Sequence, residues 1–185
     1  MGLFERKSGN TDVVWDLPPK LIQALAPDLD IGSLRLLDFV TIRIDRLAGL
    51  MNQQTRQMLS ERFDLSFIEW QCLAFLGERG DLTAAEICRL TGYDKAQVSH
   101  ALRDLAKRKL IHRATTTAKA VPIELTTDGR DLFKRCVTAR RRLERAHLER
   151  LSPEQRVALY EALTILARSL VDESTERHKQ PAKRA

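Results

Sequence analysis

The sequence of 185 residues has few of the residues that break or cross-link a fold. It contains eight glycines and six prolines, too few for a collagen-like or low-complexity chain and for a turn-rich, mostly β protein. Its three cysteines, Cys72, Cys88 and Cys136, are odd in number and form no CxxC pair. They therefore exclude a disulfide scaffold and predict reduced cytosolic thiols.

Long apolar runs and catalytic motifs are also lacking. No stretch of about 18 apolar residues occurs, so no transmembrane helix is expected. Residues 1–20 carry Asp12, Asp16 and two prolines where a secretory signal needs an apolar segment. The four histidines have no metal-ligand spacing, and no Gly-rich phosphate loop or nucleophile elbow is present. We expect a cytoplasmic protein that is not an enzyme and holds no cofactor or metal.

Positive charge is concentrated in one part of the sequence. The chain has 31 Lys and Arg and 25 Asp and Glu, which gives a net charge of +6. Residues 83–119 hold 8 basic and 3 acidic side chains, whereas residues 1–82 hold 9 basic and 12 acidic ones. A local excess of this kind favours a polyanion partner, because neutralised phosphates release counterions. The alternative interpretation is an ordinary solvated face.

Apolar spacing and capping signals predict a mainly helical chain. Apolar residues three to four apart predict helices over 18–26 and 33–62. Three further helices, over 67–78, 84–90 and 95–109, each follow a capping-box pair. These pairs are Ser66 with Glu69, Thr83 with Glu86, and Asp94 with Gln97. Strands over 110–113 and 121–125 form a hairpin, and two long helices begin at Thr126 or Thr127 and at Ser152.

A short helix, a turn containing Gly92, a longer helix and a hairpin together predict a winged helix-turn-helix. The buried stripe of the longer helix is expected at Val98, Ala101, Leu102 and Leu105. Its outward residues are the expected DNA contacts, namely Lys95, Ala96, Gln97, Ser99, His100 and Arg103, with Lys107, Arg113 and Lys119 added for the backbone and the wing. The alternative is an amphipathic helix with a solvated face.

Five segments in order resemble the MarR family of bacterial transcription regulators. They are Leu65–Leu73, Thr91–Leu102, Leu105–Arg113, Leu125–Arg130 and Leu151–Gln155. The resemblance covers residues 34–170 and implies a mainly α fold with a small β-hairpin wing, which binds double-stranded DNA.

The sequence departs from the family pattern at three places. The family often has Asp-Arg-Arg at the wing tip, where this chain has Thr117, Ala118 and Lys119. His100 replaces an arginine that many relatives carry, so we expect an unusual operator and pH-dependent binding. The first 32 residues exceed the usual family length.

The resemblance also implies a homodimer built from the first long helix and the last two. Independently, the apolar residues of the last helices need a partner surface; these are Leu143, Leu148, Leu151, Tyr160, Leu163 and Leu166. The expected organisation is an N-terminal extension (1–32), a dimerisation helix (33–64), a DNA-binding lobe (65–126), C-terminal dimerisation helices (127–171) and a flexible tail (172–185).

Many relatives release DNA when an aromatic acid binds between the dimer helices and the DNA-binding lobe. The resemblance suggests Arg43 and Arg46 for the carboxylate, with Phe39 and Trp70 as apolar walls. The alternative is that the arginines pair with Asp45, Asp38 or water, and that Trp70 is a core residue. For redox sensing, Cys136 is a better candidate than Cys72 or Cys88, which fall on buried faces.

The sequence therefore predicts a dimeric, sequence-specific transcription regulator, a repressor released by a small ligand and bound to a pseudo-palindromic operator. The alternative is a winged-helix module for protein interaction or DNA architecture, without a small-molecule effector.

Overall fold

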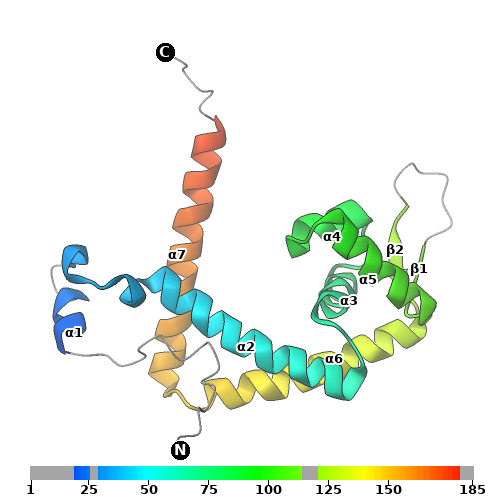
Figure 1. Ribbon diagram of the computed structural model, residues 1–185, viewed down its shortest axis with the longest axis horizontal. Coiled ribbons are helices and arrows are strands. Elements are labelled where there is room, and N and C mark those ends of the chain that lie inside the picture. Colours follow the sequence, from blue (N-terminus) through cyan, green and yellow to red (C-terminus); the bar gives the residue numbers. More distant parts are fainter. Residues whose placement is uncertain (1–18, 26–28, 114–120, 180–185) are drawn as a thin grey trace, which may run out of the picture. The chain divides into compact units, whose positions relative to one another are not determined.

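The computed structural model describes residues 19–25, 29–113 and 121–179 (Figure 1). Its elements are the helices α1 (Pro19–Leu25), α2 (Val40–Phe63), α3 (Phe67–Arg79), α4 (Ala84–Thr91), α5 (Lys95–Lys107), α6 (Thr127–Leu148) and α7 (Pro153–Lys179), and the strands β1 (Ile111–Arg113) and β2 (Ile123–Leu125). Two 3-10 turns, η1 (Ile31–Ser33) and η2 (Leu36–Asp38), precede α2. The predicted mainly α fold with a small hairpin is confirmed. The chain divides into two compact units, residues 1–136 and 137–185.

The three helices of the predicted DNA-binding lobe begin where the capping boxes predict. In α3, α4 and α5 the cap side chain accepts from the third helical amide, and the Glu or Gln there accepts from the cap amide. The Gln97 amide donates to Asp94 at 2.8 Å, for example. Each box satisfies two amides that would otherwise lack partners at a helix start.

The core of the lobe lies where α3, α4 and α5 pack on one another and where the hairpin covers α3. The predicted stripe of α5 is buried at all four positions, Val98, Ala101, Leu102 and Leu105. Strands β1 and β2 pair antiparallel, with Ile111 opposite Leu125. Leu82 adds a bridge to Ile123 through two backbone hydrogen bonds of 2.9 and 3.2 Å.

The start of α6 is fixed against the end of α5 by the Leu-Thr-x-x-Gly sequence. Thr126 donates from its hydroxyl to the Lys109 carbonyl at 2.7 Å and accepts from the Gly129 amide at 3.0 Å. A Cβ at Gly129 would lie 1.9 Å from the Leu110 carbonyl oxygen. Only glycine allows this close approach, so the motif that supported the family resemblance has a packing reason.

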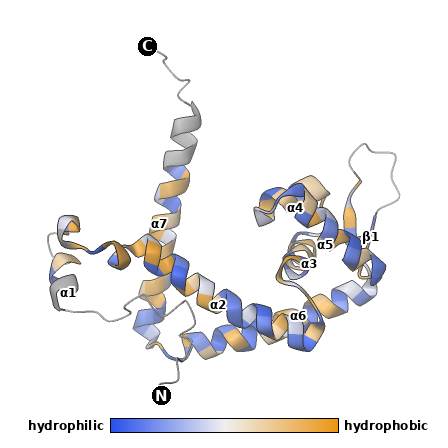
Figure 2. Ribbon diagram, viewed as in Figure 1, coloured by the Kyte–Doolittle hydropathy of each residue, from blue (hydrophilic) through white to orange (hydrophobic). Residues whose placement is uncertain are grey.

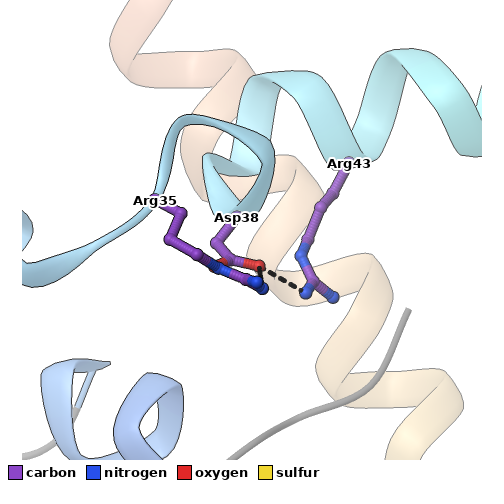
Figure 3. Close-up of polar contacts among 3 residues, drawn as sticks. All are labelled: Arg35, Asp38 and Arg43. Atoms are coloured by element: carbon purple, nitrogen blue, oxygen red, sulfur yellow. Dashed lines mark hydrogen bonds and ion pairs between the residues drawn. The ribbon is translucent and has the colours of Figure 1, made fainter. Parts of the chain in front are cut away.

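The long helix begins at Val40 rather than at the expected Ser33. Residues 31–38 instead form the two 3-10 turns, and the buried Asp38 carboxylate accepts from Arg35 at 2.6 and 3.0 Å and from Arg43 at 3.0 Å (Figure 3). The hydrogen bonds from Arg35 and then Arg43 lower the pKa of Asp38 to about 2. These contacts replace the continuous helix that the apolar spacing alone predicts.

Other boundaries also differ from the expectation. Helix α7 continues to Lys179, beyond the predicted tail start at residue 172. Strand β1 begins one residue later than predicted, because Lys109 has a left-handed backbone (φ 57°) and the Leu110 amide donates back to Leu105. Strand β2 begins at Ile123 rather than at residue 121. In the described residues, no helix has the length and apolar character needed to span a membrane.

Candidate nucleic-acid interface

Helices α4 and α5 form the helix-turn-helix. Helix α4 ends at Gly92, whose left-handed backbone (φ 73°) is the conformation that glycine favours. The chain then passes Tyr93 and enters α5 at the Asp94 cap. Because α5 buries its apolar stripe on its own lobe, its opposite face and its first turns remain exposed. This is the arrangement that presents a recognition helix to a major groove.

The structure places the predicted DNA contacts of α5 on this exposed face. Exposed residues are Lys95, Ala96, Gln97, Ser99, His100, Arg103 and Lys107. Arg113 is also exposed, at the end of β1. Lys119, the predicted wing contact, lies outside the described residues. Seven of these eight exposed side chains, including the imidazole of His100, can form hydrogen bonds with base edges or phosphates. The eighth, Ala96, offers only a methyl group.

An acidic residue of α5, Asp104, lies among the predicted DNA contacts without being one of them. One carboxylate oxygen of Asp104 lies 2.9 Å from His100 Nδ1 in an ion pair, and the other accepts from Lys107 Nζ at 3.1 Å. The Lys107 hydrogen bond is the largest cause that holds the pKa of Asp104 below its ordinary value, and the charge of His100 contributes. The i, i+4 and i+3 spacing of these three residues is the sequence signal that could have found the cluster.

Arg108 lies in the positively charged stretch of residues 83–119, but its side chain binds carbonyl groups at the end of α2. Its guanidinium donates to the carbonyls of Asp64 at 2.5 Å and Phe63 at 3.2 Å. Asp64 is the left-handed C-cap of α2 (φ 50°), so Arg108 satisfies acceptors at the end of that helix. The partners are more than 40 residues apart in the sequence, and no local pattern predicts the contact.

A groove of about 1150 Å³ runs beside the recognition helix. Its walls come from the end of α2, the start of α3 and one flank of α5, and they include Arg56, Glu69, His100, Asp104 and Arg108. The Arg56 guanidinium lies 5.0 Å from the centre of the Phe67 ring. The groove therefore holds charges of both signs beside the exposed face of α5.

The contacts of two predicted effector residues, Arg43 and Trp70, differ from the predicted ones. Arg43 pairs with Asp38 at 3.0 Å (Figure 3), and the buried Trp70 stacks on Phe133 with ring centres 6.3 Å apart. Phe39 is the residue before α2 and is exposed, and Arg46, the seventh residue of α2, is half-buried. The structure thus shows the core position for Trp70 that the alternative interpretation gave it, and the effector site stays a prediction.

The cysteines are free thiols. Cys72 and Cys136 are both fully buried, and burial raises their pKa values to about 12 and about 11. The preference for Cys136 as the more reactive thiol was wrong, because a buried thiol with a raised pKa has little of the reactive thiolate. Cys88 is half-buried.

Known proteins show the same fold and sequence pattern. A model described as the MarR family matches residues 63–119. An HTH-type transcriptional regulator of Bacillus subtilis, YfiV, is 26% identical over 117 residues, which are 62% of this chain and 73% of YfiV. Staphylococcus aureus MepR, solved in a complex with DNA, is 25% identical with a TM-score of 0.61, over 71% of this chain and 98% of that one.

A third relative shows the fold alone. It is a Mycobacterium tuberculosis MarR family protein solved with p-aminosalicylic acid, 24% identical with a TM-score of 0.61, over 70% of this chain and 98% of that one. The matched region contains the helix-turn-helix, the start of the wing and the exposed face of α5. The chain is therefore similar to the MarR family of transcription regulators, in sequence over residues 63–119 and in fold over about 70% of its length.

Proposed function

We propose that this regulator binds a pseudo-palindromic operator as a homodimer, with α5 in the major groove and the wing at the flanking backbone. The exposed polar face of α5, opposite a fully buried stripe, carries this proposal. The charge of residues 83–119 supports it, as does the DNA complex of the related MepR. The proposed contacts are those predicted from the sequence, including Lys119 of the wing.

Exposed apolar residues support the dimer. Figure 2 shows hydrophobic residues distributed along α7. The exposed ones are Val157, Leu159, Tyr160, Leu163, Ile165, Leu166, Leu170 and Val171, with exposed fractions of 38% to 68%. In and before α2, Leu36, Phe39, Val40, Ile44 and Leu47 are also exposed. Large exposed apolar patches mark association sites. The resemblance to the MarR family implies that the partner is a second copy of the chain.

We further propose that the regulator is a repressor and that an aromatic acid releases it from DNA. The M. tuberculosis relative was solved with such an acid. In this chain, Arg43 is already bound to Asp38, so an incoming carboxylate must compete with Asp38 or share the guanidinium. The proposed effector residues remain Phe39, Arg43, Arg46 and Trp70.

The test is selection of duplexes from a random pool by the full-length protein, followed by gel shifts on the selected sequence. We expect two half-sites about one helical turn apart and a preference of about 10³-fold or more over random DNA. A panel of phenolic acids should lower the affinity. Binding without sequence preference would instead support an architectural module, and absence of DNA binding would support a protein-interaction module.

A further inference from the structure

The carboxylate of Asp104 lies between two side chains of the proposed DNA-contacting face. His100 and Lys107 are 71% and 69% exposed, whereas Asp104 is 32% exposed. One carboxylate oxygen, Oδ2, contacts His100 Nδ1 at 2.9 Å, and the other, Oδ1, contacts Lys107 Nζ at 3.1 Å. With both oxygens engaged, Asp104 is placed to orient its neighbours rather than to contact a base itself.

The charge of Asp104 bears on which nitrogen of His100 carries hydrogen. Asp104 is ionised near neutral pH, because Lys107 and His100 favour the charged form of the carboxylate. An ionised carboxylate 2.9 Å away attracts an N–H group at Nδ1 and repels the lone pair that Nδ1 would otherwise present, so this contact favours the hydrogen on Nδ1. In the neutral imidazole, the exposed Nε2 is then a hydrogen-bond acceptor.

We propose that Asp104 is a positioning residue that fixes His100 as the Nδ1–H tautomer, so that Nε2 accepts a hydrogen bond from an exocyclic amino group in the major groove. The groups that donate there are adenine N6 and cytosine N4, whereas guanine presents two acceptors on its edge. The inference rests on the proposed contact between α5 and bases. It makes Asp104 a determinant of operator sequence, although Asp104 itself contacts no base.

Other charged groups border the same groove as His100. Arg108 is engaged with the carbonyls at the end of α2, and Glu69 accepts the Ser66 amide in the capping box of α3. Arg56 of α2 lies over the Phe67 ring, and Asp64 is the cap of α2. The direct polar contact to the imidazole comes from Asp104, so this carboxylate is the one to remove.

The first experiment measures the tautomer without DNA. In protein labelled with 15N-histidine, two-bond 15N–1H correlation spectra at about pH 8.5, above the ordinary titration range of imidazole, show which nitrogen is protonated. His100→Gln assigns the signal. We expect the Nδ1–H pattern in the wild type and a shift toward Nε2–H in Asp104→Ala. Asp131→Ala is the matched control, because Asp131 pairs with Lys134 three residues on but has no histidine contact. An Nε2–H pattern in the wild type would overturn the proposal.

The second experiment uses duplexes selected by the wild-type protein. Each adenine is replaced in turn by purine, which lacks the 6-amino group, and each cytosine by 2-pyrimidinone, which lacks the 4-amino group. At one position per half-site we expect a loss of roughly fivefold in wild-type affinity. Asp104→Ala and His100→Ala should lose this sensitivity, and Asp131→Ala should keep it.

The outcomes separate the inference from the proposed function. If Asp104→Ala changes the affinity for all duplexes equally, the carboxylate acts only through charge and the inference fails. The inference also fails if no amino deletion affects the wild type. If the wild type selects no sequence at all, the proposed function fails, while the NMR experiment still decides the tautomer.

Discussion

Helices α5 and α7 both carry apolar side chains at helical spacing, yet they use them differently. Helix α5 buries its four stripe residues on its own lobe. Between Pro153 and Asp172, in contrast, α7 has no buried residue, and its apolar side chains include Leu163 at 42% and Leu170 at 64% exposed. The lobe of α3, α4 and α5 therefore completes its core within one chain, whereas the apolar side chains of α7 are exposed in the single chain, and the proposed dimer would bury them. Helical periodicity therefore predicts an apolar face, but it does not distinguish a face that packs on the same chain from a face that packs on a partner.

The largest expected effect is loss of the core of the lobe. Leu105 is fully buried, so Leu105→Ala removes methyl groups and leaves a cavity. We expect the free energy of unfolding to fall by about 2–5 kcal/mol, measured by urea unfolding at several protein concentrations. An effect below about 1 kcal/mol would contradict the assignment of Leu105 to a closed core.

The matched substitution on α7 is Leu163→Ala. We expect the dimer dissociation free energy to fall by roughly 2 kcal/mol, because the side chain is exposed in the single chain and buried only in the proposed dimer. Sedimentation equilibrium measures this change. If Leu163→Ala lowered the stability of the lobe and left the dimer unchanged, the contrast between the two helices would be wrong.

On the exposed face of α5, Arg103→Ala is expected to weaken operator binding by about 1–3 kcal/mol without changing the stability of the lobe. Gel shifts on the selected operator and on random DNA measure the effect. Unchanged operator affinity would remove Arg103 from the contacts. Lys119→Ala serves as the comparison. We expect it to weaken binding to all DNA sequences similarly and to lower the slope of log K against log salt concentration by about one, which corresponds to the loss of one phosphate contact.

The smallest effect concerns the turn before α2. The pKa of Asp38 is lowered from its ordinary value to about 2, so its contribution to stability is present above about pH 4 and is lost as the pH falls toward 2. Asp38→Asn should therefore be less stable than the wild type at neutral pH. The difference should shrink as acid is added, as measured by hydrogen exchange of the first turn of α2. A constant difference from pH 7 to 2 would show that the carboxylate charge is not the cause.

The sequence predicted the lobe well because its signals are local. The cap pairs at Ser66, Thr83 and Asp94 satisfy amides three residues away, so they act wherever the helix lies. The buried stripe of α5 follows from the 3.6-residue period. The start of α2 was missed, because the apolar spacing at Leu36 and Leu37 also fits a helix and the turn depends on the contacts of Asp38 with Arg35 and Arg43.

For the proposed interface, the sequence identified which side of α5 faces outward, since burial of the opposite side leaves no alternative. It did not identify the roles of Asp104 and Arg108. Arg108 contributes to the positive charge of residues 83–119, and only the structure shows that its guanidinium caps the end of α2. The roles of charged side chains depend on which acceptors the fold brings within hydrogen-bond distance.

The amino-acid sequence by itself determined where the helices of the lobe start, which face of α5 is apolar and where positive charge gathers, because capping, periodicity and composition act over a few residues. Only the tertiary structure decided that Arg108 joins the ends of α5 and α2, that Gly129 must approach Leu110, and that Trp70 packs on Phe133. Those contacts join residues distant in the chain, and their formation depends on how the whole lobe packs.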